Sequence, residues 1–277
     1  MTKKGFLSYL IPAVAVYLAL MTVFTFWDYE ITDALYRPGT PFGKIAEVLG
    51  PLFMPFCMIY GCVGVGFSLK TRGAGRFFAF FGLALAFLYA TFIGVMTFWH
   101  SYAPWLFIPS IVAYAAFTAF TVRLNFGIRR RGEKFRLLHR SIVSVVFATA
   151  LVSLLGVDIV KSVFGRVRYL NLTDPAAYRP WYRLNRFDFN SSFPSGHASR
   201  AASSVCFALL PLYAGKKPSI PLELLSLSFT LTVSVSRLFE GMHYPSDVLT
   251  GAFLTFTAYF VCKRVFLWTN PDEKPLS

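Results

Sequence analysis

The stretch Phe193-Pro194-Ser195-Gly196-His197 stands where a loop rich in tyrosine and arginine meets a long apolar run. Proline followed by a small hydroxyl residue and glycine, directly before a helical pattern, predicts the start of a helix. The first N–H groups of a helix carry partial positive charge, and glycine lets the backbone approach a ligand closely, so this start is a natural seat for a phosphate. His197 in the first turn is then placed to give a proton to the group that leaves the phosphate.

The chain around this stretch is too apolar for a soluble domain. Of its 277 residues, 56% are hydrophobic and only 14% are charged, whereas soluble domains carry roughly 25% charged residues. The apolar residues recur in runs of about 18 or more, which is long enough to cross roughly 30 Å of hydrocarbon. The composition therefore predicts an all-α, polytopic transmembrane helix bundle.

We expect about eight membrane spans. They lie near residues 6–27, 46–69, 77–98, 105–122, 141–160, 195–215, 220–238 and 246–262. The loop at 169–192 is rich in aromatic residues and arginine, which is typical of an interfacial belt; a lid over a substrate is the alternative. His100 and His139 belong to no motif, and we expect both at the membrane interface.

The net charge of +14 follows from lysines and arginines that mostly flank the apolar runs. Membrane topology explains this placement, so we expect no nucleic-acid partner. Most of the basic residues lie at the two termini and in the segments 70–76, 123–140 and 216–217. The positive-inside rule puts these parts in the cytoplasm and the loops with Lys161, His197 and His243 on the opposite face. We expect an integral protein, of a bacterial inner membrane, whose site is periplasmic or extracellular.

Three patches of reactive side chains fall on that opposite face. They are Lys161 and Arg168 with Arg166 between them, then residues 194–197, then Ser236, Arg237, His243 and Asp247. Such a set suits phosphoryl transfer, because cations neutralise phosphate oxygens, one histidine attacks and the other protonates the leaving oxygen. Each patch alone has an ordinary interpretation as a snorkelling anchor, a helix cap or an interfacial residue. Together, on one face, they predict a catalytic site.

The three patches also resemble the type 2 phosphatidic acid phosphatase family, whose motifs are shared by glucose-6-phosphatases and vanadium haloperoxidases. The family pattern is Lys, six residues, Arg-Pro; then Pro-Ser-Gly-His; then Ser-Arg, five residues, His, three residues, Asp. The chain matches at 161–168, 194–197 and 236–247, with Tyr169 in the place of the proline. Because the family usually has six spans, we expect a catalytic domain at 77–277 and a transmembrane addition at 1–76 that lies outside the match.

The resemblance implies a role for each matching residue. His243 would be the nucleophile that forms a phosphohistidine, Asp247 would hold its ring, and His197 would be the general acid. The phosphate cradle would consist of Lys161, Arg168, Ser195, Gly196 through its N–H, and Arg237. Arg166 and Ser236 are candidate substrate contacts. The resemblance implies no metal or other cofactor, and the sequence has no carboxylate cluster suited to one.

We therefore expect a metal-independent phosphatase that hydrolyses a phosphate monoester or diphosphate of a lipid at the outer face of the membrane. Family substrates include phosphatidic acid, phosphatidylglycerol phosphate, polyprenyl diphosphate and lipid A phosphates, and the resemblance leaves all of them open. A phosphotransferase, which passes the phosphate to a lipid hydroxyl, and a phosphatase with a soluble substrate remain alternatives. A transporter or flippase is less favoured, because its polar residues would lie near mid-membrane on broken helices.

Overall fold

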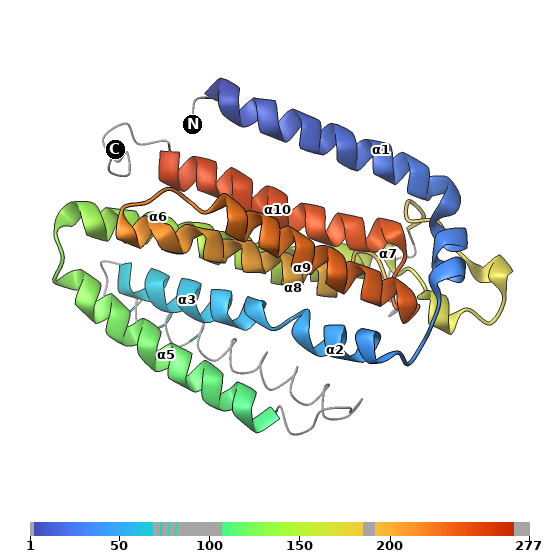
Figure 1. The fold of residues 1–277 in the computed structure, drawn as a ribbon, viewed down its shortest axis with the longest axis horizontal. Coiled ribbons are helices and arrows are strands. Elements are labelled where there is room, and N and C mark those ends of the chain that lie inside the picture. Colours follow the sequence, from blue (N-terminus) through green and yellow to red (C-terminus); the bar gives the residue numbers. More distant parts are fainter. Residues whose placement is uncertain are drawn as a thin grey trace. The chain divides into compact units, whose positions relative to one another are not determined.

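Within residues 3–68, 107–184 and 192–268, which the computed structural model describes together with Gly73, Phe77 and Phe81, every regular element is a helix (Figure 1). The α-helices are α1 (Lys3–Leu35), α2 (Pro41–Leu49), α3 (Phe53–Ser68), α5 (Phe107–Arg129), α6 (Glu133–Leu151), α7 (Val157–Phe164), α8 (Gly196–Ala202), α9 (Ile220–Phe239) and α10 (Pro245–Trp268). A π-helical stretch, η2 (Val152–Gly156), joins α6 to α7. The 3-10 helices are η3 (Tyr169–Asn171), η4 (Pro175–Ala177) and η5 (Ser203–Ala214). The predicted all-α class is confirmed.

Six of the described helices are long and apolar enough to cross a membrane, judged by length and composition. They are Leu10–Leu35, Pro41–Ser68, Ile108–Arg129, Glu133–Asn171, Ile220–Phe239 and Pro245–Leu267. These helices support the predicted class, a multi-pass membrane protein. Two of the eight expected spans are not among them. Apart from Phe77 and Phe81, the run at 77–98 lies outside the described residues. The run at 195–215 forms the short helix α8 followed by the 3-10 helix η5 instead of one long α-helix.

The contacts group the chain into two compact units. One consists of Met1–Gly50, Val152–Ser203 and Leu224–Ala258, and the other of Pro51–Leu151, Ser204–Glu223 and Tyr259–Ser277. All three motifs fall in the first unit, together with the first 50 residues. The domain boundary expected near residue 76 stays a prediction, but the N-terminal residues belong with the motifs in their packing.

In the first unit, the helix α1 lies along the first half of α10 (Figure 1). The ring of Tyr17 stacks on that of Phe253 with centroids 4.0 Å apart, and the Tyr17 hydroxyl lies 3.2 Å from the hydroxyl of Thr250. We expected the first span to end near residue 27, whereas α1 continues to Leu35. The last turns of α1 carry polar side chains with partners in the protein, so the helix extends beyond its apolar run.

In the second unit, α3 packs against α5 and α6. Gly61 and Gly64 allow the close approach of α3 to α6, because a Cβ atom at either position would overlap Phe147 or Val143. His139 is buried, with Nε2 3.0 Å from the Asn125 side-chain oxygen and Nδ1 2.6 Å from the Tyr213 hydroxyl. The interfacial position expected for His139 is therefore wrong, since these partners satisfy the ring inside the unit.

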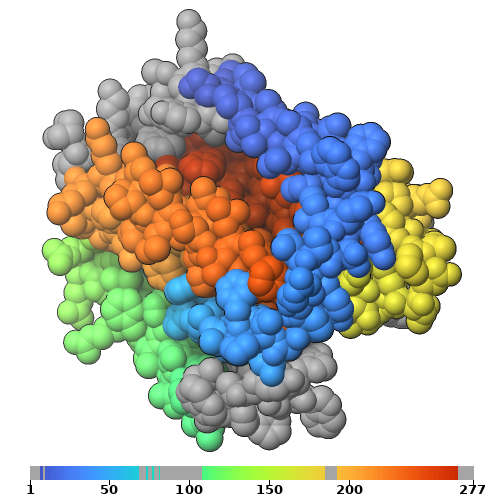
Figure 2. All heavy atoms as spheres, turned by 45° about the vertical axis from the view of Figure 1, so that its right-hand side comes forward, coloured from blue at the N-terminus to red at the C-terminus, as the bar shows by residue number. Residues whose placement is uncertain are grey.

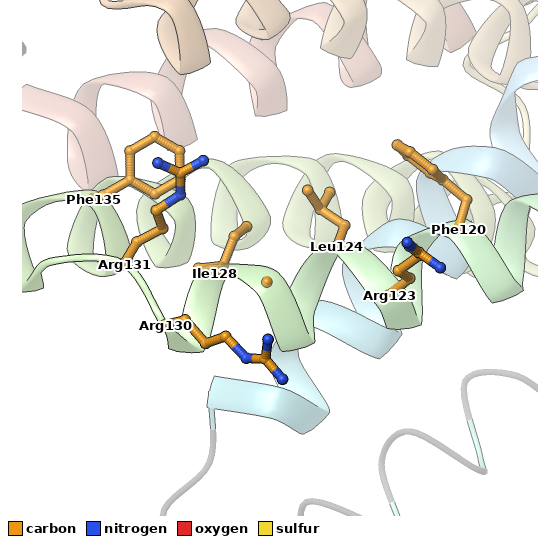
Figure 3. A pocket seen from close by; sticks show the side chains of 8 residues that line it. Phe120, Arg123, Leu124, Ile128, Arg130, Arg131 and Phe135 are labelled. Atoms are coloured by element: carbon orange, nitrogen blue, oxygen red, sulfur yellow. The ribbon is translucent and has the colours of Figure 1, made fainter.

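The second unit also holds a groove of about 650 Å³ on α5 and the start of α6 (Figure 3). Its lining consists of Phe120, Arg123, Leu124, Gly127, Ile128, Arg130, Arg131 and Phe135. No residue of the three motifs takes part, so the size of this groove is no argument for the location of the active site.

Candidate active site

The second motif forms the start of α8. Ser195 is the N-cap, in an extended conformation, and its hydroxyl accepts a hydrogen bond from the Ala198 N–H at 3.3 Å. Gly196 and His197 are the first two helical residues, so His197 lies in the first turn as expected. Pro194 comes just before the cap and not at the first helical position. The Ser195 N–H donates to the carbonyl oxygen of Asp247 at 2.8 Å, which joins the second motif to the third.

The third motif spans the turn from α9 to α10. Gly241 makes this turn with a φ of +62°, a conformation that L side chains rarely adopt. The N–H groups of Met242 and His243 then return to the Arg237 carbonyl oxygen, at 3.0 and 3.4 Å. Asp247, in the first turn of α10, accepts a hydrogen bond from the Tyr244 N–H at 2.8 Å. The turn therefore brings His243 and Asp247 to the same end of the unit.

His243 and Asp247 form a buried pair. The Nδ1 atom of His243 lies 3.6 Å from Oδ2 of Asp247, and Nδ1 has no hydrogen-bond partner within the described part of the chain. This separation is longer than a hydrogen bond, and catalytic hydrogen bonds often shorten only when substrate binds. Burial lowers the pKa of His243 to about 4, although the nearby negative charge of Asp247 acts in the opposite direction. The ring is therefore neutral near pH 7, which is the form that a nucleophile needs.

Several cations surround the two histidines. The charges of Lys161 and Arg168 act on His243, and those of Arg237, Arg200 and Lys161 act on His197. The structure thus brings the three cations of the expected cradle, Lys161, Arg168 and Arg237, into one electrostatic neighbourhood, although the first and third motifs are far apart in sequence. Such a concentration of positive charge is costly to maintain without a compensating anion.

Arg237 has an unsatisfied donor in this neighbourhood. Its Nη2 donates to the Gly43 carbonyl oxygen at 2.5 Å and its Nε to the Ser236 hydroxyl at 3.2 Å. Its third nitrogen, Nη1, is buried and finds no hydrogen-bond partner among the residues that the structure describes. A buried guanidinium N–H without a partner is unfavourable, and a bound phosphate oxygen would satisfy it.

The two candidate substrate contacts have partners inside the protein instead. The Ser236 hydroxyl, fully buried, donates to the Val233 carbonyl oxygen at 2.7 Å. Arg166 is only 2% exposed, and its guanidinium lies between the carboxylates of Asp28 and Asp247, at 2.8 and 2.7 Å. Arg166 is therefore engaged in holding Asp247, and Ser236 in holding Arg237.

Comparison with known proteins identifies the family of the segment that carries the motifs. Residues 141–271 match the family model of the PAP2 superfamily, and this range contains all three motifs. This segment belongs to the PAP2 superfamily. The resemblance that the motifs indicate is confirmed for this segment, and a PAP2 domain implies phosphatase-type activity in a membrane protein. No solved structure matches the chain.

Tyr169, which replaces the proline of the PAP2 motif, connects the domain to α1. Its hydroxyl donates to the carboxylate of Asp33, and its ring centroid lies 5.0 Å from that of Tyr36. In the loop that follows, the Trp181 indole N–H donates to the Thr25 hydroxyl at 3.1 Å. Figure 2 shows this yellow loop against the blue N-terminal segment. The described part of the loop therefore docks on a helix outside the PAP2 match, while residues 185–191 lie outside the described residues.

Two charged residues of the site have no counterpart in our sequence interpretation. Arg200 follows His197 by three residues, a spacing that places both on one side of a helix. One of its guanidinium nitrogens would lie 2.7 Å from a Cβ atom at position 196, so glycine there leaves space for it, and Asp158 lies 3.5 Å from the other. Because Arg200 lies one helical turn after His197, the sequence could have indicated it. The second charged residue, Asp28, has no such signal in the sequence around it.

In the part of the chain that the structure describes, no group of three or more His, Cys, Asp or Glu side chains is arranged to hold a metal ion. The predicted independence from metal stays a prediction, and its test follows from the chemistry below.

Proposed function

We propose that the protein is a lipid phosphatase that hydrolyses a phosphate monoester or diphosphate through a phosphohistidine on His243. One observation carries the proposal. A neutral, buried His243 has a carboxylate on its Nδ1 side, and Lys161 and Arg168 act on it from nearby. Membership in the PAP2 superfamily supports the reaction class. The apolar helices support a substrate that the membrane itself delivers.

The reaction has two steps. Since Nδ1 faces Asp247, the other ring nitrogen of His243 attacks phosphorus, and the bond from phosphorus to the leaving oxygen breaks. His197 gives that oxygen a proton, so the alcohol or phosphate leaves in its protonated form. In the second step His197 takes a proton from water, the water oxygen attacks phosphorus, and inorganic phosphate leaves with His243 restored. Lys161, Arg168 and Arg237 neutralise the charge on the non-bridging oxygens in both steps.

Phosphate release from a panel of lipid phosphates tests this function. The purified protein in detergent should release inorganic phosphate from at least one of them, and the rate should survive excess EDTA because fixed cations supply the charge that a metal would supply. A rate that EDTA abolishes and magnesium restores would contradict this mechanism. If labelled phosphate appears on a second lipid instead of in solution, the enzyme is a phosphotransferase with the same covalent step.

We further propose that both termini are cytoplasmic and that the active site faces the periplasm or the exterior. Single cysteines introduced at residues 170–184 should react with an impermeant thiol reagent in intact cells, and those at 124–135 only after lysis. The background is low, because three of the four native cysteines are buried and Cys262 is half-buried. The reverse labelling pattern would overturn this orientation.

A further inference from the structure

Asp28 lies on α1, outside the PAP2 match, and is almost completely buried, with 1% of its surface exposed. Its Oδ2 atom lies 2.8 Å from Nη2 of Arg166, and its Oδ1 atom accepts a hydrogen bond from the Ser246 N–H at 2.8 Å. The Ser246 hydroxyl also donates to Oδ2. A buried carboxylate is costly unless it is paired and hydrogen-bonded, and Asp28 meets both conditions through residues of the PAP2 domain.

The partner of Asp28 leads directly to the catalytic pair. Arg166 donates through Nη1 to Oδ1 of Asp247 at 2.7 Å and to the Ser246 hydroxyl at 2.8 Å. Asp247 is fully buried, and its Oδ2 atom accepts from the Ser192 hydroxyl at 2.5 Å. That same oxygen is the one beside His243. A chain of hydrogen bonds therefore runs from Asp28 through Arg166 to Asp247, whose Oδ2 lies 3.6 Å from Nδ1 of the His243 ring.

The position of Arg166 depends on both ends of this chain. One terminal nitrogen of its guanidinium bonds to each carboxylate, so the planar group is fixed between them. The Tyr244 ring lies under it, with the Arg166 Cζ atom 3.9 Å from the ring centroid. Without the charge of Asp28, the full positive charge of Arg166 would act on Asp247. Asp247 would then stabilise a positively charged His243 ring less, and that ring gains charge when it attacks phosphorus.

We propose that Asp28 is a positioning residue for the Asp247–His243 pair, acting through Arg166, so that the N-terminal helix α1 completes the active site of the PAP2 domain. The inference rests on the proposed role of His243 as the nucleophile. Two further contacts hold α1 in register with the site, from Tyr169 to Asp33 and from Trp181 to Thr25. The contact of Asp28 differs from these two, because its partner Arg166 also binds Asp247.

Asp28→Asn tests the inference, since it keeps the shape of the side chain and removes its charge. Glu30→Gln is the matched control, because Glu30 is an exposed carboxylate two residues further along α1. The measurement is the rate constant for phosphoenzyme formation in a single turnover, with kcat and KM from steady-state phosphate release. We expect Asp28→Asn to lower the formation rate and kcat by about 10- to 100-fold, as loss of an outer hydrogen-bonding partner does at other sites, with KM nearly unchanged. Glu30→Gln should match the wild type.

Further variants separate positioning from folding. Asp28→Glu restores the charge and should recover part of the rate, and Ser246→Ala removes one hydroxyl of the chain without changing any charge and should lower the rate less than Asp28→Asn does. If the Asp28→Asn protein forms less phosphoenzyme in total but forms it with the wild-type rate constant, then part of the protein is misfolded and the rest is normal. The role of Asp28 is then only structural, and the inference fails. It also fails if KM alone changes, or if Asp28→Asn behaves as Glu30→Gln does. If the wild-type protein itself forms no acid-labile phosphoenzyme, the proposed function fails instead.

Discussion

His243→Ala should be inactive on every phosphate substrate and should never trap labelled phosphate. The proposed mechanism requires His243 for the covalent bond to phosphorus, so without its ring no phosphoenzyme can form and both steps of the reaction are lost. The ring is suited to this role because burial keeps it neutral, with a pKa of about 4. Acid-quench experiments with labelled substrate, followed by denaturing gel separation, measure the trapped phosphate directly.

His197→Ala should fail in a different way. His197 donates a proton to the leaving oxygen, a contribution typically worth about 100- to 10,000-fold. An alkoxide needs that proton, whereas p-nitrophenolate leaves without it. We therefore expect His197→Ala to be far more impaired on a lipid phosphate than on p-nitrophenyl phosphate, and still to form an acid-labile phosphoenzyme.

The two variants together decide the assignment. If His197→Ala loses the label while His243→Ala retains it, the roles of nucleophile and acid are exchanged. If His197→Ala loses the same fraction of activity on both substrates, His197 also binds the phosphate. That role is compatible with its place in the first turn of α8 beside three cations. Parallel measurements of elution volume and melting temperature show whether each variant remains folded.

The fold class and the local geometry of the motifs could be predicted because their signals are local. A run of apolar residues identifies a membrane helix from its own composition. The third motif lies within one helix–turn–helix, so residues that are close in its sequence are also close in space. It consists of Ser236, Arg237, His243 and Asp247. The N-cap Ser195 is likewise a local feature, and it stands one position before the helix as its residue type predicts.

The contacts that complete the site could not be predicted in this way. Asp28 and Arg166 are 138 residues apart, and nothing near either position indicates the other. An aspartate directly after an apolar run suggests the end of a span, whereas here the helix continues to Leu35 and Arg166 neutralises the side chain. His139 shows the same limit, since only folding brings Asn125 and Tyr213 to its two nitrogens.

Arg166 illustrates why residue type alone does not assign a role. An arginine between two motif cations resembles a further phosphate ligand, and Arg168, two residues away, remains in the electrostatic neighbourhood of His243. The difference is that Arg166 has both of its terminal nitrogens bonded to buried carboxylates. A guanidinium so engaged cannot turn toward a substrate without leaving two charges unpaired, which would be strongly unfavourable.

Asp247→Asn should lower kcat by about 10,000-fold, the effect of the equivalent change beside the catalytic histidine in the serine protease triad, where the amide stabilises the wrong tautomer. The same logic applies here, because an amide NH₂ facing Nδ1 of His243 would favour a proton on the ring nitrogen that must attack. Asp174→Asn is the matched control, since Asp174 is exposed and only caps the 3-10 helix η4. It should retain wild-type activity.

The pH dependence of the Asp247→Asn defect separates orientation from protonation. The carboxylate of Asp247 raises the pKa of His243, so its removal lowers a pKa that is already about 4, and the ring stays neutral across the working range. The defect should therefore be the same at about pH 6 and about pH 9, since no proton is lost from His243 between them. A defect that shrinks as pH rises would mean that His243 is protonated in the variant. Asp247 would then act on the charge of the ring, and the tautomer argument would be wrong.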